Sequence, residues 1–198
     1  MASDDEQVRL AGFEIAYRIG PPAVGMLAEF LRDDRVAQRR LAIDFLIDLA
    51  PDTESIQPAL HRALRDPDES VARDAARALG ALGPKAAPSV PALVDALGSD
   101  EELVRLYAAE ALASVGPRAA SAVDALIALL RDPAPGVRWA ACEGLAGIGP
   151  AAARAVPRLI DALKDDSLYV RICAAGALGH IGPEAKPAVA ALTAAALS

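Results

Sequence analysis

Residues 137–163 read VRWAACEGLAGIGPAAARAVPRLIDAL, and this stretch decides the fold. Its first half ends in Gly149-Pro150, where the glycine can adopt a left-handed backbone and the proline cannot continue a helix. Its second half places apolar residues at i, i+3, i+4 and i+7, namely Val156, Leu159, Ile160 and Leu163. That spacing forms one apolar stripe along a helix. The stretch therefore predicts two helices joined by a Gly-Pro turn.

The same pattern returns at a fixed interval along the chain. Each helix-ending glycine stands 33 residues after the one before it, at Gly83, Gly116, Gly149 and Gly182. A fixed period of this length is typical of stacked repeats, in which each helix pair buries its apolar face against its neighbours. No segment shows the alternation of a strand. We expect an all-α, right-handed α-solenoid of 33-residue helix-turn-helix repeats.

The period also predicts the organisation of the chain. Residues 1–198 are expected to form a single repeat domain, in which residues 38–184 are the regular repeats. Residues 1–37 are expected to be an irregular N-terminal cap that opens with a helix over about 7–19, because Gly20-Pro21 stands three residues out of phase. An unpaired helix is expected over 185–198. This last segment is almost uncharged, so we expect a partner, a second copy or further chain to cover it.

The repeat resembles a known family. The phrase V-R-x-x-A-A-x-A-L-x-x-I-G-P followed by A-V-P-x-L-I-x-A-L-x-D is similar to the short bacterial HEAT-like repeat, the kind also found in phycobilisome lyase subunits. The resemblance covers nearly the whole chain. It implies that the Ala-Val-Pro helices lie on the convex side and the Val-Arg helices on the concave side. It also implies a structural Asp/Arg ladder between repeats, formed by Arg105, Arg138, Arg171, Asp132 and Asp165.

Composition narrows the classes of partner. The formal net charge is −7 and the pI is near 4.9, which disfavours nucleic acid because such binding depends on Lys and Arg neutralising phosphates. No uncharged apolar run approaches the roughly 18 residues that span a bilayer, so no membrane partner is expected. The acidic N-terminus does not resemble a secretory signal, and a cytoplasmic protein is expected. Cys142 and Cys173 fall in different columns of the repeat, which predicts neither a disulfide nor a metal site.

The residue types that carry most enzyme chemistry are scarce. The chain has two histidines, His61 and His180, expected to be a half-buried packing residue and an exposed residue near a helix end. It lacks zinc-ligand spacing, a Gly-rich phosphate loop, a nucleophile elbow, and the His-Glu pairs of HEAT-repeat iron hydroxylases. We therefore expect no catalytic residues, no metal, no cofactor and no enzyme activity.

Function is expected where equivalent positions differ between repeats, because packing determines the remaining positions. On the Val-Arg helices the later repeats carry an apolar strip edged by glutamates, and the earlier ones a mixed-charge surface. The predicted partner-binding residues are Leu106, Tyr107, Glu110, Trp139, Glu143, Ile172, Arg73 and Arg77. The alternative is that the apolar members lean sideways and pack between neighbouring helices.

Three functions remain open at this stage. The leading prediction is a non-catalytic protein–protein interaction scaffold or adaptor that holds a protein partner in its concave groove. The resemblance to phycobilisome lyase subunits allows a chromophore (bilin) lyase or its accessory subunit. A third alternative is HEAT-like recognition of DNA lesions, against which the acidic balance argues.

Overall fold

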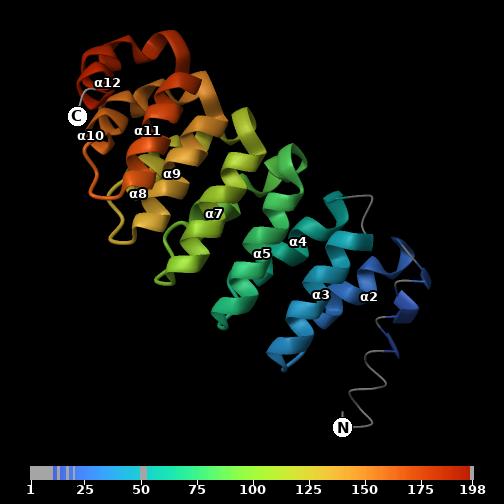
Figure 1. The fold of residues 1–198 in the computed structure, drawn as a ribbon. Coiled ribbons are helices and arrows are strands. Elements are labelled where there is room, and N and C mark those ends of the chain that lie inside the picture. Colours follow the sequence, from blue (N-terminus) through green and yellow to red (C-terminus); the bar gives the residue numbers. More distant parts are fainter. Residues whose placement is uncertain (1–10, 13, 17, 20, 50–52, 197–198) are drawn as a thin grey trace.

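The computed structural model describes residues 11–12, 14–16, 18–19, 21–49 and 53–196, and every regular element in these ranges is helical. The helices form a curved stack of antiparallel pairs that runs from one terminus to the other (Figure 1). The predicted all-α solenoid is confirmed. Of the helix expected over 7–19, the described residues are helical and the others lie outside the described ranges.

The stack has two layers. One layer consists of the long helices α3 (Val36–Leu49), α5 (Glu69–Ala81), α7 (Glu102–Val115), α9 (Pro135–Ile148) and α11 (Leu168–Ile181). The other consists of α2 (Val24–Phe30), α4 (Thr53–Ala63), α6 (Val90–Ala96), α8 (Val123–Leu129), α10 (Val156–Ala162) and α12 (Val189–Ala196). Neighbouring long helices pack directly on one another, whereas neighbouring short helices meet mainly through the turns between them. The stack therefore curves toward the long helices, which form the concave face.

Each regular pair turns at a Gly-Pro corner and enters its short helix through a 3-10 segment. These segments are η2 (Gly83–Ser89), η3 (Gly116–Ala122), η4 (Gly149–Ala155) and η5 (Gly182–Ala188), and η1 (Pro21–Ala23) stands before α2. The four corner glycines have φ between 55° and 80°, a conformation that other residues adopt only with strain. The helix predicted to begin at residue 185 is thus 3-10 through Ala188 and α-helical only over Val189–Ala196.

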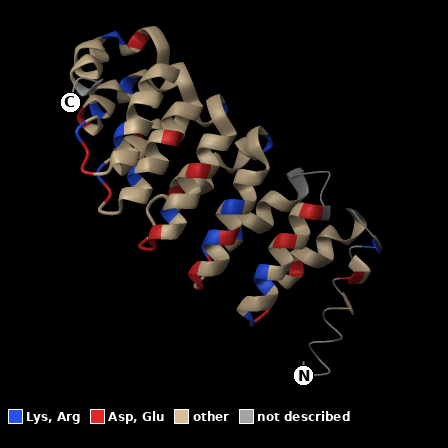
Figure 2. Ribbon diagram, viewed as in Figure 1, with Lys and Arg blue, Asp and Glu red and all other residues tan. Residues whose placement is uncertain are grey.

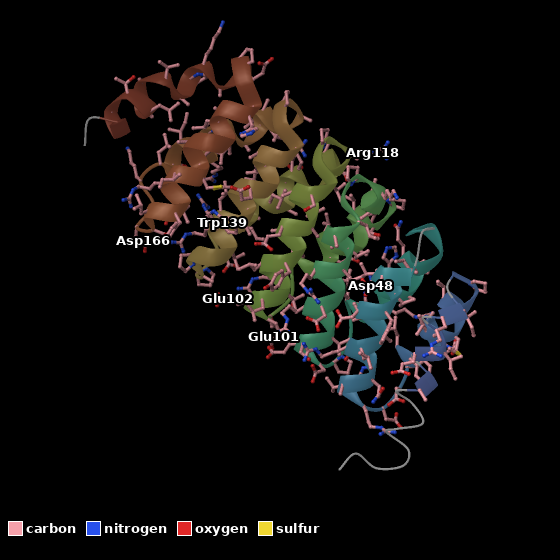
Figure 3. All side chains as sticks on the ribbon, turned by 45° about the vertical axis from the view of Figure 1, so that its right-hand side comes forward. Asp48, Glu101, Glu102, Arg118, Trp139 and Asp166 are labelled. Atoms are coloured by element: carbon pink, nitrogen blue, oxygen red, sulfur yellow. The ribbon has the colours of Figure 1, made fainter. Side chains whose placement is uncertain are left out.

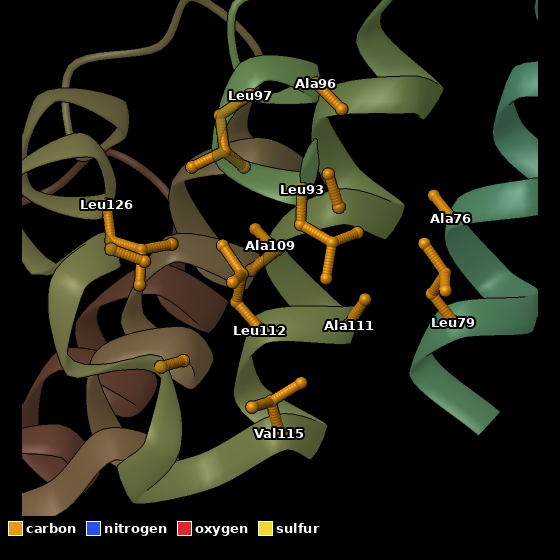
Figure 4. Packing of buried hydrophobic residues seen from close by; sticks show 14 of the residues in the cluster. Ala76, Leu79, Leu93, Ala96, Leu97, Ala109, Ala111, Leu112, Val115 and Leu126 are labelled. Carbon is orange, nitrogen blue, oxygen red and sulfur yellow. The ribbon is translucent and has the colours of Figure 1, made fainter. Parts of the chain in front are cut away.

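Leucines of the short helices fill the space beside alanines of the long ones. Leu93 and Leu126 are fully buried against Ala111 and Leu112 of α7 (Figure 4). The small side chains let the long helices come close: a Cβ on Gly147 of α9 would stand 2.5 Å from the Ala113 carbonyl oxygen of α7. An alanine-rich, aromatic-poor composition suits this packing, because alanine favours the helix and lets neighbouring helix axes approach closely.

One helical segment, Glu102–Leu129, is long and apolar enough to cross a membrane by length and composition. In the structure this segment comprises α7, η3 and α8, and the chain turns at Gly116. The two α-helices then lie in different layers of the stack (Figure 1). The segment is consequently not one straight helix of the roughly 30 Å that a bilayer core requires.

A ladder of ion pairs ties neighbouring repeats together along one edge. Three arginines each bond both oxygens of an aspartate 27 residues ahead, at 2.7–3.0 Å: Arg39–Asp66, Arg105–Asp132 and Arg138–Asp165. In each of these arginines, Nη1 also donates to the carbonyls six and five residues behind, at 2.8–3.2 Å. Arg171 forms the same two carbonyl bonds. The implied ladder is confirmed for Arg105 and Arg138, and Arg39 adds a rung.

The ladder is less exposed than surface ion pairs usually are. The three carboxylate-paired arginines and their aspartates are only 8–13 % exposed, because the turns fold over them. Each aspartate also accepts a bond from the backbone N–H two residues on, as Asp132 does from Ala134 at 2.9 Å. Paired, bidentate and shielded charges of this kind stabilise a fold more than exposed pairs, which contribute about 0–1 kcal/mol.

Candidate functional site on the concave face

The later repeats expose apolar side chains at the beginning of the concave helices. Trp139 of α9 and Tyr169 of α11 line a small cavity of about 370 Å³, together with Pro135, Gly136 and Ser167. Trp139 is half-buried, whereas Tyr169 is 75 % exposed. Two further apolar residues of α11 are open to solvent, Leu168 at 55 % and Ile172 at 62 %. We call Trp139, Leu168, Tyr169 and Ile172 the apolar patch; Leu168 and Ile172 also line a cavity of about 840 Å³ with Ile160 of α10 and Leu192 of α12.

A second cavity, of about 500 Å³, lies farther along the same helices. It extends between α7, α9 and α11 and is lined by Ser114, Glu143, Ile172, Cys173 and His180, among others. Its width reflects small residues on the adjoining turns, since a Cβ on Gly176 of α11 would meet nothing within 4 Å. Ile172 thus belongs to the apolar patch and also reaches this cavity.

One glutamate, Glu143, lines this cavity, and its charge acts on nearby Glu110 of α7. Burial, and the charge of Glu143, raise the pKa of Glu110. The Cys173 thiol donates to Glu143 Oε1 at 3.1 Å. Hydrogen bonding to the Cys142 thiol, and burial, raise the pKa of Cys173. A neutral thiol beside half-buried carboxylates gives this part of the face a negative potential.

The predicted strip is not continuous. Leu106 and Tyr107 of α7 are half-buried and packed against the core. Leu106 leans toward α9, where its Cδ1 lies 3.2 Å from the position that a Cβ on Gly136 would take. Leu106 therefore packs between neighbouring helices, which is the alternative that the sequence left open. Of the predicted apolar residues, Trp139 and Ile172 are the ones in contact with the concave cavities.

The mixed-charge surface of the earlier repeats is largely neutralised within the chain. Arg77 pairs with Asp44 of the preceding long helix at 3.1 Å. Arg73 and Arg40 both pair with the buried Asp74, at 3.1 and 2.6 Å. Arg73 and Arg77, which the sequence predicted to contact a partner, are therefore engaged with aspartates of their own chain.

Tyr169 and Leu168 are functional candidates that the sequence analysis missed. Both precede Val170, the residue from which the varying positions were counted. A comparison of the preceding column would have found Tyr169, because the equivalent residues are Ser70, Leu103 and Gly136.

The histidines and cysteines are placed as follows. His61 is half-buried, as expected, and its Nε2 lies 2.7 Å from Ser89 Oγ; burial and nearby Arg65 lower its pKa. His180 is exposed, with Nδ1 2.9 Å from the Gly176 carbonyl oxygen.

Cys142 and Cys173 are both buried and not disulfide-bonded. Their different columns nevertheless meet across α9 and α11, because neighbouring helices are offset. Among the described residues no group of three or more His, Cys, Asp or Glu is arranged to hold a metal ion.

Comparison with known families decides the classification. The family described as HEAT repeats matches residues 26–113, 56–134, 90–155 and 123–198, which together span most of the chain. The chain belongs to the HEAT-repeat family. No curated protein matches this HEAT-repeat chain in sequence.

Solved structures agree with the family. The chain is similar to an engineered protein at 25 % identity, with a TM-score of 0.67 over 82 % of this chain and 81 % of that one. It is also similar to the CpcE–CpcF complex of phycocyanin lyase from Nostoc sp. PCC7120, at 25 % identity and a TM-score of 0.67, over 80 % of this chain and 65 % of that one. A designed armadillo repeat protein in complex with the peptide (KR)4 shares the fold, at 17 % identity and a TM-score of 0.69, over 91 % of this chain and 95 % of that one.

Proposed function

We propose that this HEAT-repeat protein is a non-catalytic scaffold that binds a segment of a protein partner on the apolar patch. The observation that carries the proposal is the exposure of Leu168, Tyr169 and Ile172 on one helix, next to the half-buried Trp139. Folding leaves these side chains in water, whereas the concave helices α3 and α5 carry paired charges such as Arg77 and Asp44. Aromatic anchors beside small cavities are typical of the residues that dominate protein interfaces.

The surroundings of the patch define the partner further. Glu143 lines the adjoining cavity, its charge acts on nearby Glu110, and no ion pair between described residues involves either glutamate. A partner that places an apolar side chain between Trp139 and Tyr169, with a basic residue nearby, would satisfy both features. The cavity beside Trp139, about 370 Å³, accommodates one such side chain.

The test compares the intact chain with one double variant and one single variant in a quantitative pull-down from native lysate. Trp139→Asp/Tyr169→Asp places charges on the patch, and circular dichroism checks the fold because Trp139 also packs partly against the core. Met26→Asp is the matched control, because Met26 is also an exposed apolar residue, 43 % exposed, but lies on α2. We expect one partner to be retained by the intact chain and by Met26→Asp and to be lost from the double variant. Equal retention by all three, with unchanged circular dichroism, would contradict the proposal.

A chromophore-lyase subunit is the second candidate, and the similarity to the CpcE–CpcF complex is the observation that favours it. It requires that the concave cavities bind a linear tetrapyrrole. Addition of a bilin to the purified chain should then shift and sharpen the bilin absorbance bands, and Trp139→Asp should abolish the change. An unchanged spectrum at a tenfold excess of protein would reject this candidate.

A further inference from the structure

The ion-pair ladder has a gap in the middle of the solenoid. The arginine expected between Arg39 and Arg105 is replaced by Ala72, and the aspartate 27 residues ahead of it is replaced by Ser99. Both members of one rung are therefore absent together. Ser99 forms the same local turn as the ladder aspartates, because its Oγ accepts a bond from the Glu101 N–H two residues on, at 3.2 Å.

The acceptors of this rung remain in place. In every other rung the arginine Nη1 donates to the carbonyls six and five residues behind it. The equivalent carbonyls here belong to Asp66 and Pro67, and no donor from the described part of the chain bonds to either of them. The site thus presents two oriented carbonyl oxygens in the positions where this fold elsewhere holds a guanidinium.

The absent side chain leaves a cavity of about 470 Å³ between the two repeats. Buried Ala72 and Val104 form part of its apolar wall. The remaining lining residues that carry charge are Asp66, Asp68, Glu69, Asp95, Glu101 and Arg65. Its outer rim consists of exposed residues, so a side chain can enter from solvent.

The charges around the cavity are not balanced. Arg39 neutralises Asp66, and Arg65 neutralises Asp95 at 2.7 Å. No ion pair of the described chain engages Glu69 or Glu101. Glu69 and Glu101 both line the cavity; hydrogen bonding with the Glu69 carboxyl group, and its charge, raise the pKa of Glu101, while the charge of Arg105 acts in the opposite direction. Figure 2 shows acidic residues at the turn that leads into α7, and Figure 3 places Glu101 and Glu102 along the edge opposite Arg118.

We propose that this cavity binds the guanidinium group of an arginine side chain presented by a protein partner. The guanidinium would donate to the carbonyl oxygens of Asp66 and Pro67 and to the carboxylates of Glu69 and Glu101, while its methylene groups contact Ala72 and Val104. The planar fork of arginine matches this arrangement as it does in the intact rungs, whereas a lysine ammonium lacks the paired donors. The proposal rests on the proposed function only in that a protein partner supplies the arginine.

The test titrates the intact protein with acetyl-Gly-Arg-Gly-amide and follows backbone amide resonances around Ala72 and Ser99 by NMR. The citrulline tripeptide is the uncharged isosteric control, and the lysine tripeptide controls for charge alone. We expect saturable shifts with the arginine peptide, several-fold weaker binding of the lysine peptide and none of the citrulline peptide. Equal responses to all three, or to arginine and lysine, would overturn the proposal.

Two variants localise the binding. Ser99→Asp supplies the missing carboxylate and should tighten arginine binding by about fivefold or more, the equivalent of one added charge-assisted contact. Ala72→Arg/Ser99→Asp completes the rung from within and should abolish binding. Unchanged affinity in Ser99→Asp would refute the proposal even if the double variant failed to fold.

A third variant separates this proposal from the proposed function. Trp139→Asp/Tyr169→Asp should leave the arginine titration unchanged, because the apolar patch lies roughly 20 Å away, about two helix spacings along the stack. If the double variant loses the protein partner of the apolar patch but its arginine titration is unchanged, the arginine-binding cavity is still supported. If the intact chain retains the partner of the apolar patch but shows no saturable shifts with the arginine peptide, only the proposal of an arginine-binding cavity is rejected.

Discussion

The ladder makes a quantitative prediction for Arg138→Met. Arg138 donates to both oxygens of Asp165 at 2.8 Å and to the carbonyls of Asp132 and Pro133 at 3.0 and 3.2 Å. Breaking a fully buried pair costs about 3–5 kcal/mol, because the remaining charge loses its partner. Asp165 keeps the bond from the Ser167 N–H at 2.9 Å and lies at an edge that water can reach. We therefore expect a loss of about 2–4 kcal/mol in the free energy of unfolding.

The assay is urea denaturation followed by circular dichroism at neutral pH and low salt. Amide exchange in α11 is measured alongside, because repeat proteins can unfold one repeat at a time. The matched control is Arg154→Met: Arg154 pairs with Asp124 at an equal 2.8 Å, but the two side chains are 52 % and 78 % exposed. This control should cost less than about 1 kcal/mol.

The double variant Arg138→Met/Asp165→Leu tests the same ion pair by replacing both of its members. It removes both charges together, so it should recover most of the loss, to within about 1–2 kcal/mol of the original chain. The reasoning would be refuted if Arg138→Met and Arg154→Met had the same effect, or if the double variant were less stable than Arg138→Met.

Three other measurements address separate features. Gly147→Ala should destabilise the chain by about 2 kcal/mol or more because its Cβ would strike the backbone of α7, whereas Gly179→Ala, into open space, should stabilise it by about 0.5–1 kcal/mol; thermal melting compares the two. Hydrogen bonds from its ladder arginine hold the pKa of Asp165 at about 2, below its ordinary 3.8, so its contribution to stability should be complete above pH 4 and lost as the pH falls toward 2; acid titration of Asp165→Asn should lack that loss. Cys142 and Cys173 are buried, so a thiol reagent should modify them only as fast as the chain opens, and rapid labelling of the native protein would contradict the packing.

Much of the fold followed from the sequence because its signals are local and recur in every repeat. The apolar stripes and Gly-Pro corners predicted the helix pairs and their period. They did not predict that residues 182–188 would be 3-10, because an apolar stripe does not distinguish i+3 from i+4 hydrogen bonding next to prolines. An Asp-Pro pair such as Asp132-Pro133 is typical of a helix N-cap and first turn, yet Asp132 stands two residues ahead of the N-cap Ala134 and its carboxylate bonds Arg105.

The candidate site was less predictable, since it depends on how side chains lean. Trp139 and Leu106 occupy equivalent positions, but the next long helix presents Gly136 to Leu106 and has Tyr169 at the equivalent position for Trp139. Arg73 and Arg77 looked available for a partner because their aspartate partners lie in another repeat or at the adjacent position. Contacts of this kind join different repeats, and no pattern within one repeat indicates them.

The ladder also bears on how such a chain can grow. Asp132 and Asp165 each bond the arginine of the preceding repeat through the carboxylate and the arginine of their own repeat through the carbonyl. A tandem duplication or deletion of one 33-residue unit among the rungs of Arg105 and Arg138 therefore preserves the ladder bonds on both sides of the junction. Removing a rung cleanly requires two substitutions in adjacent units, as at Ala72 and Ser99. The number of regular repeats can thus change without loss of ion pairs, whereas the loss of one rung requires two separate substitutions.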